Sequence, residues 1–311
     1  MIRIIVYPFM LSVLIFQTAM CQTAQDEMSF QYLASWGGPG TGKGELKAPE
    51  DLSVDPSGYL YIADAGNQRV QKFNPSGNYI TEIGGFGWEA EQFDSPVSIW
   101  AGNGLDVFVA DYNNHRIQRF DKDLHFIGEF TSSENEPDYL QFGYPLDVDL
   151  SPQGELFCLD SENRRVLKLD IVGNPQISFG DYDSGEGRLV NPQKLLLSQR
   201  GNVYVSDQES AEIVVFDPLG NFLHAFGRNS LKHPCGMAEL GENWILVADA
   251  TAKQILIFKK PGFPAGSFEL PHITGLQFKE PVAVGAWKNR IYVLDKIRCM
   301  IDCFEWTGPN R

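Results

Sequence analysis

Basic residues are scarce in this sequence. Its 311 residues include 25 lysines and arginines against 40 aspartates and glutamates, a formal net charge of −15. The basic residues are gathered neither in a stripe nor in a tail. Because nucleic acids and anionic membranes attract clustered lysine and arginine, we expect no nucleic-acid partner and no attraction to an anionic membrane.

Cysteine is also rare, and the pattern is not that of a disulfide framework. Beyond residue 21 there are four cysteines: Cys158, Cys235, Cys299 and Cys303. The last two are four positions apart in a predicted strand, so they lie about 13 Å apart, too far for a bridge. A C-x-x-C pair is absent from the sequence, which argues against a thiolate zinc site.

Long apolar runs are missing except at the N-terminus. Arg3 precedes an apolar run over residues 4–16, and Ala19 and Cys21 suit the −3 and −1 positions of a cleavage site. The run is shorter than the about 20 residues that span a bilayer. We therefore predict a signal peptide over residues 1–21, a mature chain over 22–311, and a secreted or periplasmic location without membrane insertion.

Two alternatives to cleavage remain open at this point. The apolar run could stay in place as an uncleaved anchor, although Pro8 interrupts it. Cys21 could instead carry a lipid anchor, although bulky Met20 occupies a position where a lipoprotein signal prefers a small residue.

Helical periodicity is not evident beyond residue 21, whereas a repeat is plain. In each of six units, a proline is followed fifteen residues later by an aspartate, or fourteen in the last unit, and nine residues further by phenylalanine or leucine. The six sets are Pro49, Asp64 and Phe73; Pro96, Asp111 and Phe120; Pro145, Asp160 and Leu169; Pro192, Asp207 and Phe216; Pro234, Asp249 and Phe258; and Pro281, Asp295 and Phe304.

Each unit has the pattern of four short strands. Segments such as "DLSVD", "YLYIAD", "RVQKF" and "NYITEIGG" are rich in β-branched and aromatic residues, and turn-forming residues separate them. Six such units predict an all-β, six-bladed β-propeller with four-stranded antiparallel blades. The sixth unit ends after its third strand, so we expect the N-terminal segment "YLASWG", residues 32–37, to complete the last blade.

The repeated segments resemble NHL repeats. The prolines, the segments "YIAD", "FVAD", "YVSD" and "LVAD", and the following "NQRVQKF" and "NHRIQRF" carry the resemblance over about residues 30–307. It implies a single six-bladed propeller, which we expect to be monomeric. Units 4 to 6 depart from the pattern, because the arginine of the first three units, at Arg69, Arg116 and Arg165, becomes Glu212, Gln254 and Met300.

The resemblance also raises an enzymatic alternative. NHL-like propellers include an amidating lyase whose histidines hold a metal in the central channel, so a similar enzyme would need several channel histidines. Of the five histidines, we place only His233, just before Pro234, near a channel mouth. One histidine is fewer than the three protein ligands usual for catalytic zinc.

Candidate site residues follow each repeated proline by two positions. These are Asp51, Ser98, Asp147, Lys194, Gly236 and Ala283, which we expect to line one mouth of the channel, with Asp51 and Lys194 on opposite blades. Two interpretations stay open: a hydrated funnel whose charges partly cancel, or a site for a ligand or cation that includes His233, where Ca²⁺ or Zn²⁺ could bind. We predict no resident cofactor.

The repeated aspartates have a structural explanation, because each can bond backbone amides in the turn that it opens and, in units 1 to 3, the arginine five residues on. A separate surface candidate is the loop over residues 131–144. Its acids accompany Tyr139, Phe142 and Tyr144, and aromatic residues are enriched at the cores of interfaces.

Two functions compete on these grounds. The first is an exported, non-enzymatic scaffold that recognises a protein, peptide or glycan through its blade-connecting loops. The second is a channel-mouth enzyme, a metal-dependent lyase or a lactonase-like hydrolase, that uses Asp51, Asp147 and His233. An intracellular RNA binder or ubiquitin-ligase module conflicts with the export signal and the acidity.

Overall fold

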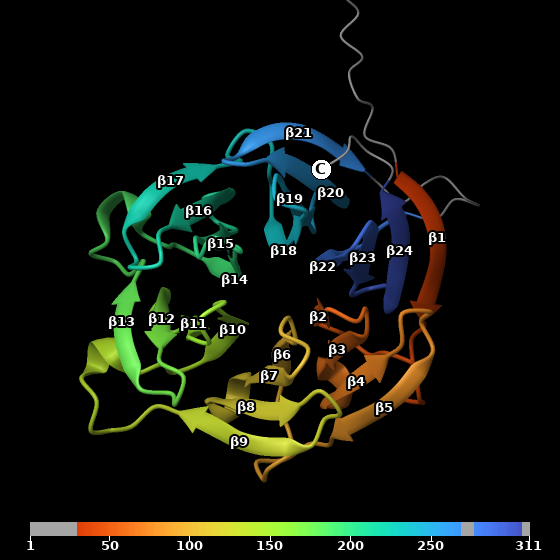
Figure 1. Cartoon of the computed structure of the whole chain (residues 1–311), viewed down its shortest axis with the longest axis horizontal. Helices are drawn as coiled ribbons and strands as arrows, with labels where there is room; N and C mark the ends of the chain where they lie inside the picture. The colour runs from red at the N-terminus through yellow and green to blue at the C-terminus, as the bar shows by residue number, and fades with distance from the viewer. Residues whose placement is uncertain (1–29, 269–276, 307–311) are drawn as a thin grey trace, which may run out of the picture.

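The computed structural model contains six sheets around a central axis (Figure 1), and it describes residues 30–268 and 277–306. Each sheet has four antiparallel strands, as the repeat predicted. The predicted signal peptide, with Cys21, lies outside the described residues. None of the helices in the described ranges has the length and apolar composition that a membrane-spanning helix needs.

The strands of each blade run from the channel to the rim. Their bounds are β2 Asp51–Val54, β3 Leu60–Asp64, β4 Arg69–Phe73 and β5 Tyr79–Gly84 in blade 1; β6 Pro96–Trp100, β7 Asp106–Asp111, β8 Arg116–Asp121 and β9 Phe126–Thr131 in blade 2; β10 Pro145–Leu150, β11 Leu156–Asp160, β12 Arg165–Leu169 and β13 Pro175–Phe179 in blade 3; β14 Pro192–Leu197, β15 Val203–Asp207, β16 Glu212–Phe216 and β17 Phe222–Phe226 in blade 4; β18 Pro234–Leu240, β19 Trp244–Asp249, β20 Gln254–Lys259 and β21 Phe263–Phe268 in blade 5; and β22 Pro281–Trp287, β23 Arg290–Asp295 and β24 Met300–Trp306 in blade 6.

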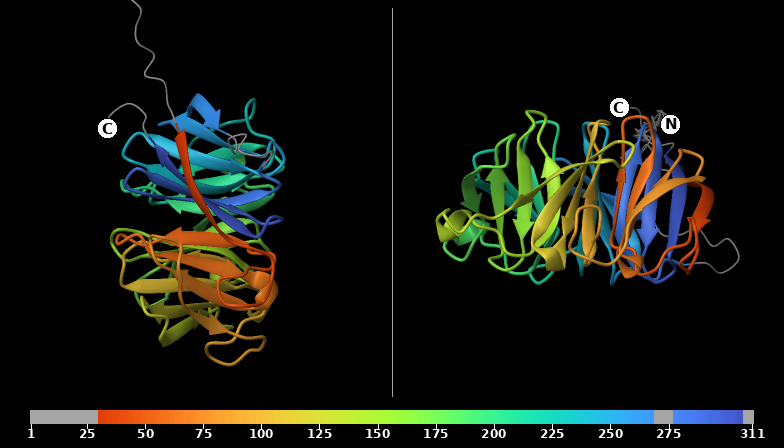
Figure 2. Two further views of the ribbon diagram at one scale, coloured as in Figure 1. Left: turned by 90° about the vertical axis from the view of Figure 1, so that its right-hand side faces the viewer. Right: turned by 90° about the horizontal axis from the view of Figure 1, so that it is seen from below.

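The N-terminal strand closes the ring. β1, Phe30–Gly37, pairs antiparallel with β24 as the outermost strand of blade 6, and the two strands lie side by side in Figures 1 and 2. Tyr32 faces Phe304 across the pair, and Trp36 faces Ile301. The predicted completion of the last blade is therefore confirmed, and β24 has no open edge there.

Apolar side chains pack between neighbouring blades. Leu52 and Ile62 of blade 1, for example, meet Tyr292 and Leu294 of blade 6 in one buried cluster. Side chains along a strand point alternately to the two faces of its sheet. A neighbouring blade covers each face, which explains why β3 is buried at every position. Packing between blades is thus what fixes the ring around its channel.

The six repeated aspartates are fully buried and hold the loop before each proline. Asp64 accepts a hydrogen bond of 2.7 Å from the amide of Lys47, seventeen residues earlier, and Asp111 accepts the equivalent bond from Asp94. The same bond recurs in the other four blades. The predicted structural role is confirmed. Besides these loop amides, the aspartates of blades 4 to 6 accept an amide in the turn that they open, from Ser210, Ala252 and Arg298.

The arginines of blades 1 to 3 hold the same loops by their carbonyl groups. Arg116 donates to the carbonyls of Trp88 at 2.7 Å, Glu89 at 2.9 Å and Gln92 at 2.9 Å, and its Nε lies 2.8 Å from Asp111. A buried arginine can satisfy several carbonyls because its planar fork carries five donors. In these blades the arginine and the aspartate together fix the path of the interblade loop.

The four cysteines in the described ranges are free and buried. This confirms the absence of a bridge between Cys299 and Cys303. The reason differs in detail from the prediction, since Cys299 lies in the turn just before β24 and only Cys303 is within the strand.

Candidate functional site in the central channel

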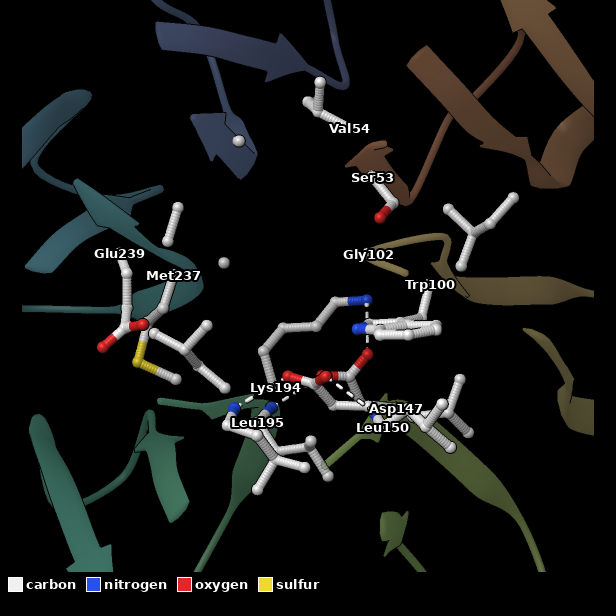
Figure 3. Close-up of a pocket in the computed structure, with 18 of the residues that line it drawn as sticks. Ser53, Val54, Trp100, Gly102, Asp147, Leu150, Lys194, Leu195, Met237 and Glu239 are labelled. Carbon is white, nitrogen blue, oxygen red and sulfur yellow. Dashed lines mark hydrogen bonds and ion pairs between the residues drawn. The ribbon is translucent and has the colours of Figure 1, made fainter. Parts of the chain in front are cut away.

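Four of the predicted site residues meet at the centre of the channel: Asp51, Ser98, Asp147 and Lys194. Lys194, on β14, extends across the channel so that its Nζ lies 2.8 Å from Asp51 Oδ2, on β2, and 3.4 Å from Asp147 Oδ1, on β10. Its ammonium group also donates to the carbonyl of Val97 at 3.0 Å. Figure 3 shows the Lys194 side chain beside Asp147 in this space.

The two carboxylates also bind the neighbouring blades. Asp51 accepts a hydrogen bond of 3.0 Å from the amide of Ile99 in blade 2. Asp147 accepts 2.6 Å from the amide of Leu195 in blade 4 and 2.5 Å from the hydroxyl of Ser98 in blade 2. The acceptor groups of this network are therefore occupied by the protein itself.

Burial and neighbouring charges shift the pKa values of Asp147 and Lys194. Burial raises the pKa of Asp147 to about 6, with Lys194 acting against the shift and Asp51 adding to it. Burial alone would lower the pKa of Lys194, but the charges of Asp147 and Asp51 outweigh it and raise that pKa. Lys194 is thus a permanent cation at neutral pH.

Lys194 separates two cavities. A cavity of about 550 Å³ opens where the innermost strands end, and a cavity of about 360 Å³ opens where they begin; Lys194 lines both. The larger cavity also holds Trp100, Asp149, Met237 and Glu239. The channel is therefore closed near its middle by the ion pairs.

The remaining predicted residues lie apart from this network. His233 lines only the smaller cavity, whereas Asp51 and Asp147 line only the larger one, so the three residues of the enzymatic hypothesis do not form one set. Ala283 does not line the channel, because its backbone packs against Gly236. Within residues 30–268 and 277–306, no group of three or more His, Cys, Asp or Glu side chains is placed to hold a metal ion.

The candidate surface aromatics separate into different environments. Tyr139 is 59% exposed on a short helix, η3, Asp138–Leu140. The prediction that Phe142 is a surface contact was wrong, because its side chain is buried in the core between blades 2 and 3. Tyr144 is half-buried and its ring centroid lies 5.0 Å from that of Tyr112.

Sequence reasoning missed Asp149, which also lines the larger cavity. It is buried and accepts 2.7 Å from the amide of Leu197 in blade 4, as Asp147 does from Leu195. The signal was available, because residues two apart on a strand face the same side. Asp149 is two positions after Asp147, so it had to point inward as well.

Asp149 gives the channel a measurable pH dependence. Burial raises its pKa well above the usual value, against hydrogen bonds from the Leu197 amide that lower it. The native state therefore binds a proton that the unfolded state releases, so the contribution of Asp149 to stability falls as pH rises above about 4. Asp149→Asn removes this dependence, and the unfolding free energy of the variant relative to the parent should increase between about pH 5 and about pH 8.

Urea unfolding of the parent and the variant across that pH range checks the prediction. The change with pH of the difference between their unfolding free energies is the relevant quantity, because the substitution can also alter a hydrogen bond at every pH. Asp217→Asn is the matched control. Bonds from Asn221 lower the pKa of Asp217 despite slight burial, so its contribution is lost only as pH falls below about 4. A difference that stays constant for Asp149→Asn would show that Asp149 does not bind the extra proton.

Comparison with known proteins agrees with the architecture. A family model described as NHL repeat matches residues 46–73 and 93–120, which lie in blades 1 and 2. The fold and these repeats define the class: the chain is a six-bladed β-propeller. More particularly, it is a propeller that carries NHL repeats.

Relatives share only part of their length with this chain. It is similar to Protein brain tumor of Drosophila melanogaster, 25% identical over 43% of this chain and 13% of the relative. It is also similar to the B-box type zinc finger protein ncl-1 of Caenorhabditis elegans, 27% identical over 42% of this chain and 15% of the relative. The matched stretch is thus a small fraction of the length of each relative.

Solved structures share the fold at low identity. A streptogramin B lyase matches with a TM-score of 0.62 and 11% identity, covering 90% of this chain and 98% of the lyase. A protein of unknown function from Bacteroides thetaiotaomicron matches with a TM-score of 0.63 and 12% identity, covering 90% of this chain and 76% of the other. At these identities the likeness concerns the fold alone.

Proposed function

We propose that this chain is an exported, non-enzymatic scaffold that recognises a protein or peptide partner through the loops that connect its blades. The observation that carries the proposal is a contrast between the channel, where the charged groups bind one another, and the loops, where large side chains are free to contact a partner. In the channel, Lys194, Asp51 and Asp147 bind one another and the adjacent blades. On the loops, by contrast, large aromatic side chains such as Trp88 and Tyr139 are exposed.

Two further points support a binding role. An ionised lysine held by two carboxylates is a poor general base, and both carboxylates already accept bonds from the neighbouring blades. The acidic composition disfavours nucleic acid as the partner. The proposed export depends on the N-terminal signal, whose cleavage after Cys21 would give a mature chain that begins at Gln22.

Site-specific cross-linking tests the binding role. A photoreactive phenylalanine analogue replaces Tyr139 on an interblade loop, or Phe263 on the opposite face as the matched control, and both residues are exposed. In the native extracytoplasmic extract, we expect one reproducible cross-linked protein at position 139 and none at 263. Failure to form any adduct at position 139 would contradict the proposal.

Two measurements test the other parts. N-terminal sequencing of the protein recovered from outside the cell should begin at Gln22, and a retained N-terminus would contradict a cleaved signal. Metal analysis addresses the enzymatic alternative. One tightly bound metal ion per chain that disappears in Asp51→Asn and Asp147→Asn would favour the lyase or hydrolase over the scaffold.

A further inference from the structure

The interblade loops all lie on one face of the ring. Because each blade has four antiparallel strands, its outermost strand ends on the face where the next innermost strand begins. Three consecutive loops, residues 85–95, 132–144 and 180–191, connect β5 to β6, β9 to β10 and β13 to β14. Figure 1 shows these blades as neighbours around the ring. We call these three loops the acidic loop surface.

Exposed aromatic side chains mark the acidic loop surface. Phe86 is 70% exposed, Trp88 75%, Tyr139 59% and Tyr182 75%. Two other interblade loops, residues 38–50 and 227–233, contain no Phe, Trp or Tyr. Aromatic side chains are enriched at the cores of interfaces, where their buried area supplies much of the binding energy.

The backbone beneath these aromatics is held in place. Arg116 binds the carbonyl of Trp88 at 2.7 Å, and Arg165 binds the carbonyl of Asp138, next to Tyr139, at 2.8 Å. In the third loop, the guanidinium of Arg188 lies 4.3 Å from the centroid of the Tyr182 ring. A partner that binds rigid aromatics loses less conformational entropy than one that must order a loop.

The same loops concentrate unpaired negative charge. Each of the three contains three acidic residues, and Arg188 is their one basic residue, which gives a formal charge of −8. Among the described residues, none of these nine acids takes part in an ion pair, whereas the channel carboxylates do. Counted in the same way, loops 38–50 and 227–233 carry formal charges of 0 and +2. The charge is therefore a property of this half of the face.

We infer that the acidic loop surface binds a basic segment of a protein partner, rich in lysine or arginine. The inference rests on the proposed function and names the class of partner. Unpaired carboxylates attract such a segment, and exposed aromatic faces hold its ammonium or guanidinium groups by cation–π contact. An acidic or neutral segment would meet the same carboxylates without compensation.

The test uses the whole mature protein and a short peptide of alternating lysine and serine, with a glutamate–serine peptide as the negative probe. We expect the lysine peptide alone to bind, with an affinity that falls as salt rises. Trp88→Ala combined with Tyr139→Ala should weaken binding about tenfold, the effect of losing two cation–π contacts. Glu89→Gln combined with Glu134→Gln should also weaken it and reduce the salt dependence.

The matched control is Leu105→Ala combined with Phe263→Ala, which removes two exposed apolar side chains from the opposite face. This variant should bind the lysine peptide as the parent does. Equal losses from both faces, or no loss from the loop variants, would show only general attraction to an acidic chain and overturn the inference. So would the absence of lysine-peptide binding.

The two proposals fail in different ways. A partner cross-linked at position 139 whose binding ignores salt and is unchanged by Glu89→Gln combined with Glu134→Gln would overturn the basic-segment inference and leave the scaffold function standing. Absence of any adduct at position 139 would instead count against the scaffold function itself.

Discussion

Lys194→Met should lower the free energy of unfolding by about 3–5 kcal/mol, the cost of removing one partner from a buried ion pair. The substitution retains most of the apolar stem of the lysine and removes its ammonium group, with the charge and the bond to the Val97 carbonyl. Asp51 and Asp147 would then remain buried without the cation that lies 2.8 Å and 3.4 Å from them. Their bonds to the Ile99 and Leu195 amides cannot replace a full positive charge.

The defect should depend on pH. Without Lys194, the main influence that lowers the pKa of Asp147 is lost, so this pKa should rise above about 6. Protonation then removes the stranded charge, and the destabilisation should be smaller at about pH 5 than at about pH 8. Lys194→Met combined with Asp51→Asn should recover part of the loss, because one charge fewer is left unpaired.

Lys122→Met is the matched control. Lys122 pairs with Asp123 at 2.6 Å, but both side chains are about half exposed, so this pair contributes little. Urea unfolding followed by circular dichroism compares the variants. If Lys194→Met unfolds at the same urea concentration as Lys122→Met, the channel ion pairs do not hold the blades.

The channel network was partly predictable because the repeat fixes which residue points inward. Asp51, Ser98, Asp147 and Lys194 each stand two positions after a repeated proline, and the strand register directs them toward the axis independently of the loop conformations. The pairing itself was not predictable. It depends on the reach of Lys194 across the channel, a distance that neither spacing nor composition contains.

The loops were less predictable than the strands for a physical reason. A strand position alternates between two faces, so burial follows from the register. Tyr139 and Phe142 lie three residues apart in one loop, and their opposite environments follow from contacts with distant residues. Arg165 holds the carbonyl of Asp138, whereas the hydroxyl of Ser132 lies 2.8 Å from the carbonyl of Phe142.

The later blades show how a repeat can weaken and keep its fold. Where Glu212 and Gln254 replace the arginine, the buried aspartate accepts an amide three residues ahead: Ser210 donates to Asp207 at 3.0 Å and Ala252 to Asp249 at 2.8 Å. The aspartate is thus satisfied with either set of donors. Where the arginine is present, it also binds carbonyl groups of the preceding loop, as in the loop that carries Trp88.

A chain that begins at Gly38, and so lacks β1, should lose at least about 5 kcal/mol of unfolding free energy, which approaches the whole stability of a typical domain. β1 covers β24 along seven residue pairs, and its Tyr32 and Trp36 pack against the inner strands of blade 6. It also supplies the hydroxyl of Ser35, which donates to the fully buried Asp302. Without β1, the ring is open between blades 6 and 1, and β24 presents unpaired backbone groups to other molecules.

Light scattering and urea unfolding check this prediction, since the shortened chain should aggregate and unfold at lower urea. Leu33→Ser in the full chain is the control, because Leu33 is 38% exposed at the bulge in β1 and its loss should change little. Adding a synthetic peptide of residues 30–37 should restore part of the stability, because the strand can pair with β24 without being covalently attached. A shortened chain that unfolds like the parent would mean that blade packing alone closes the ring.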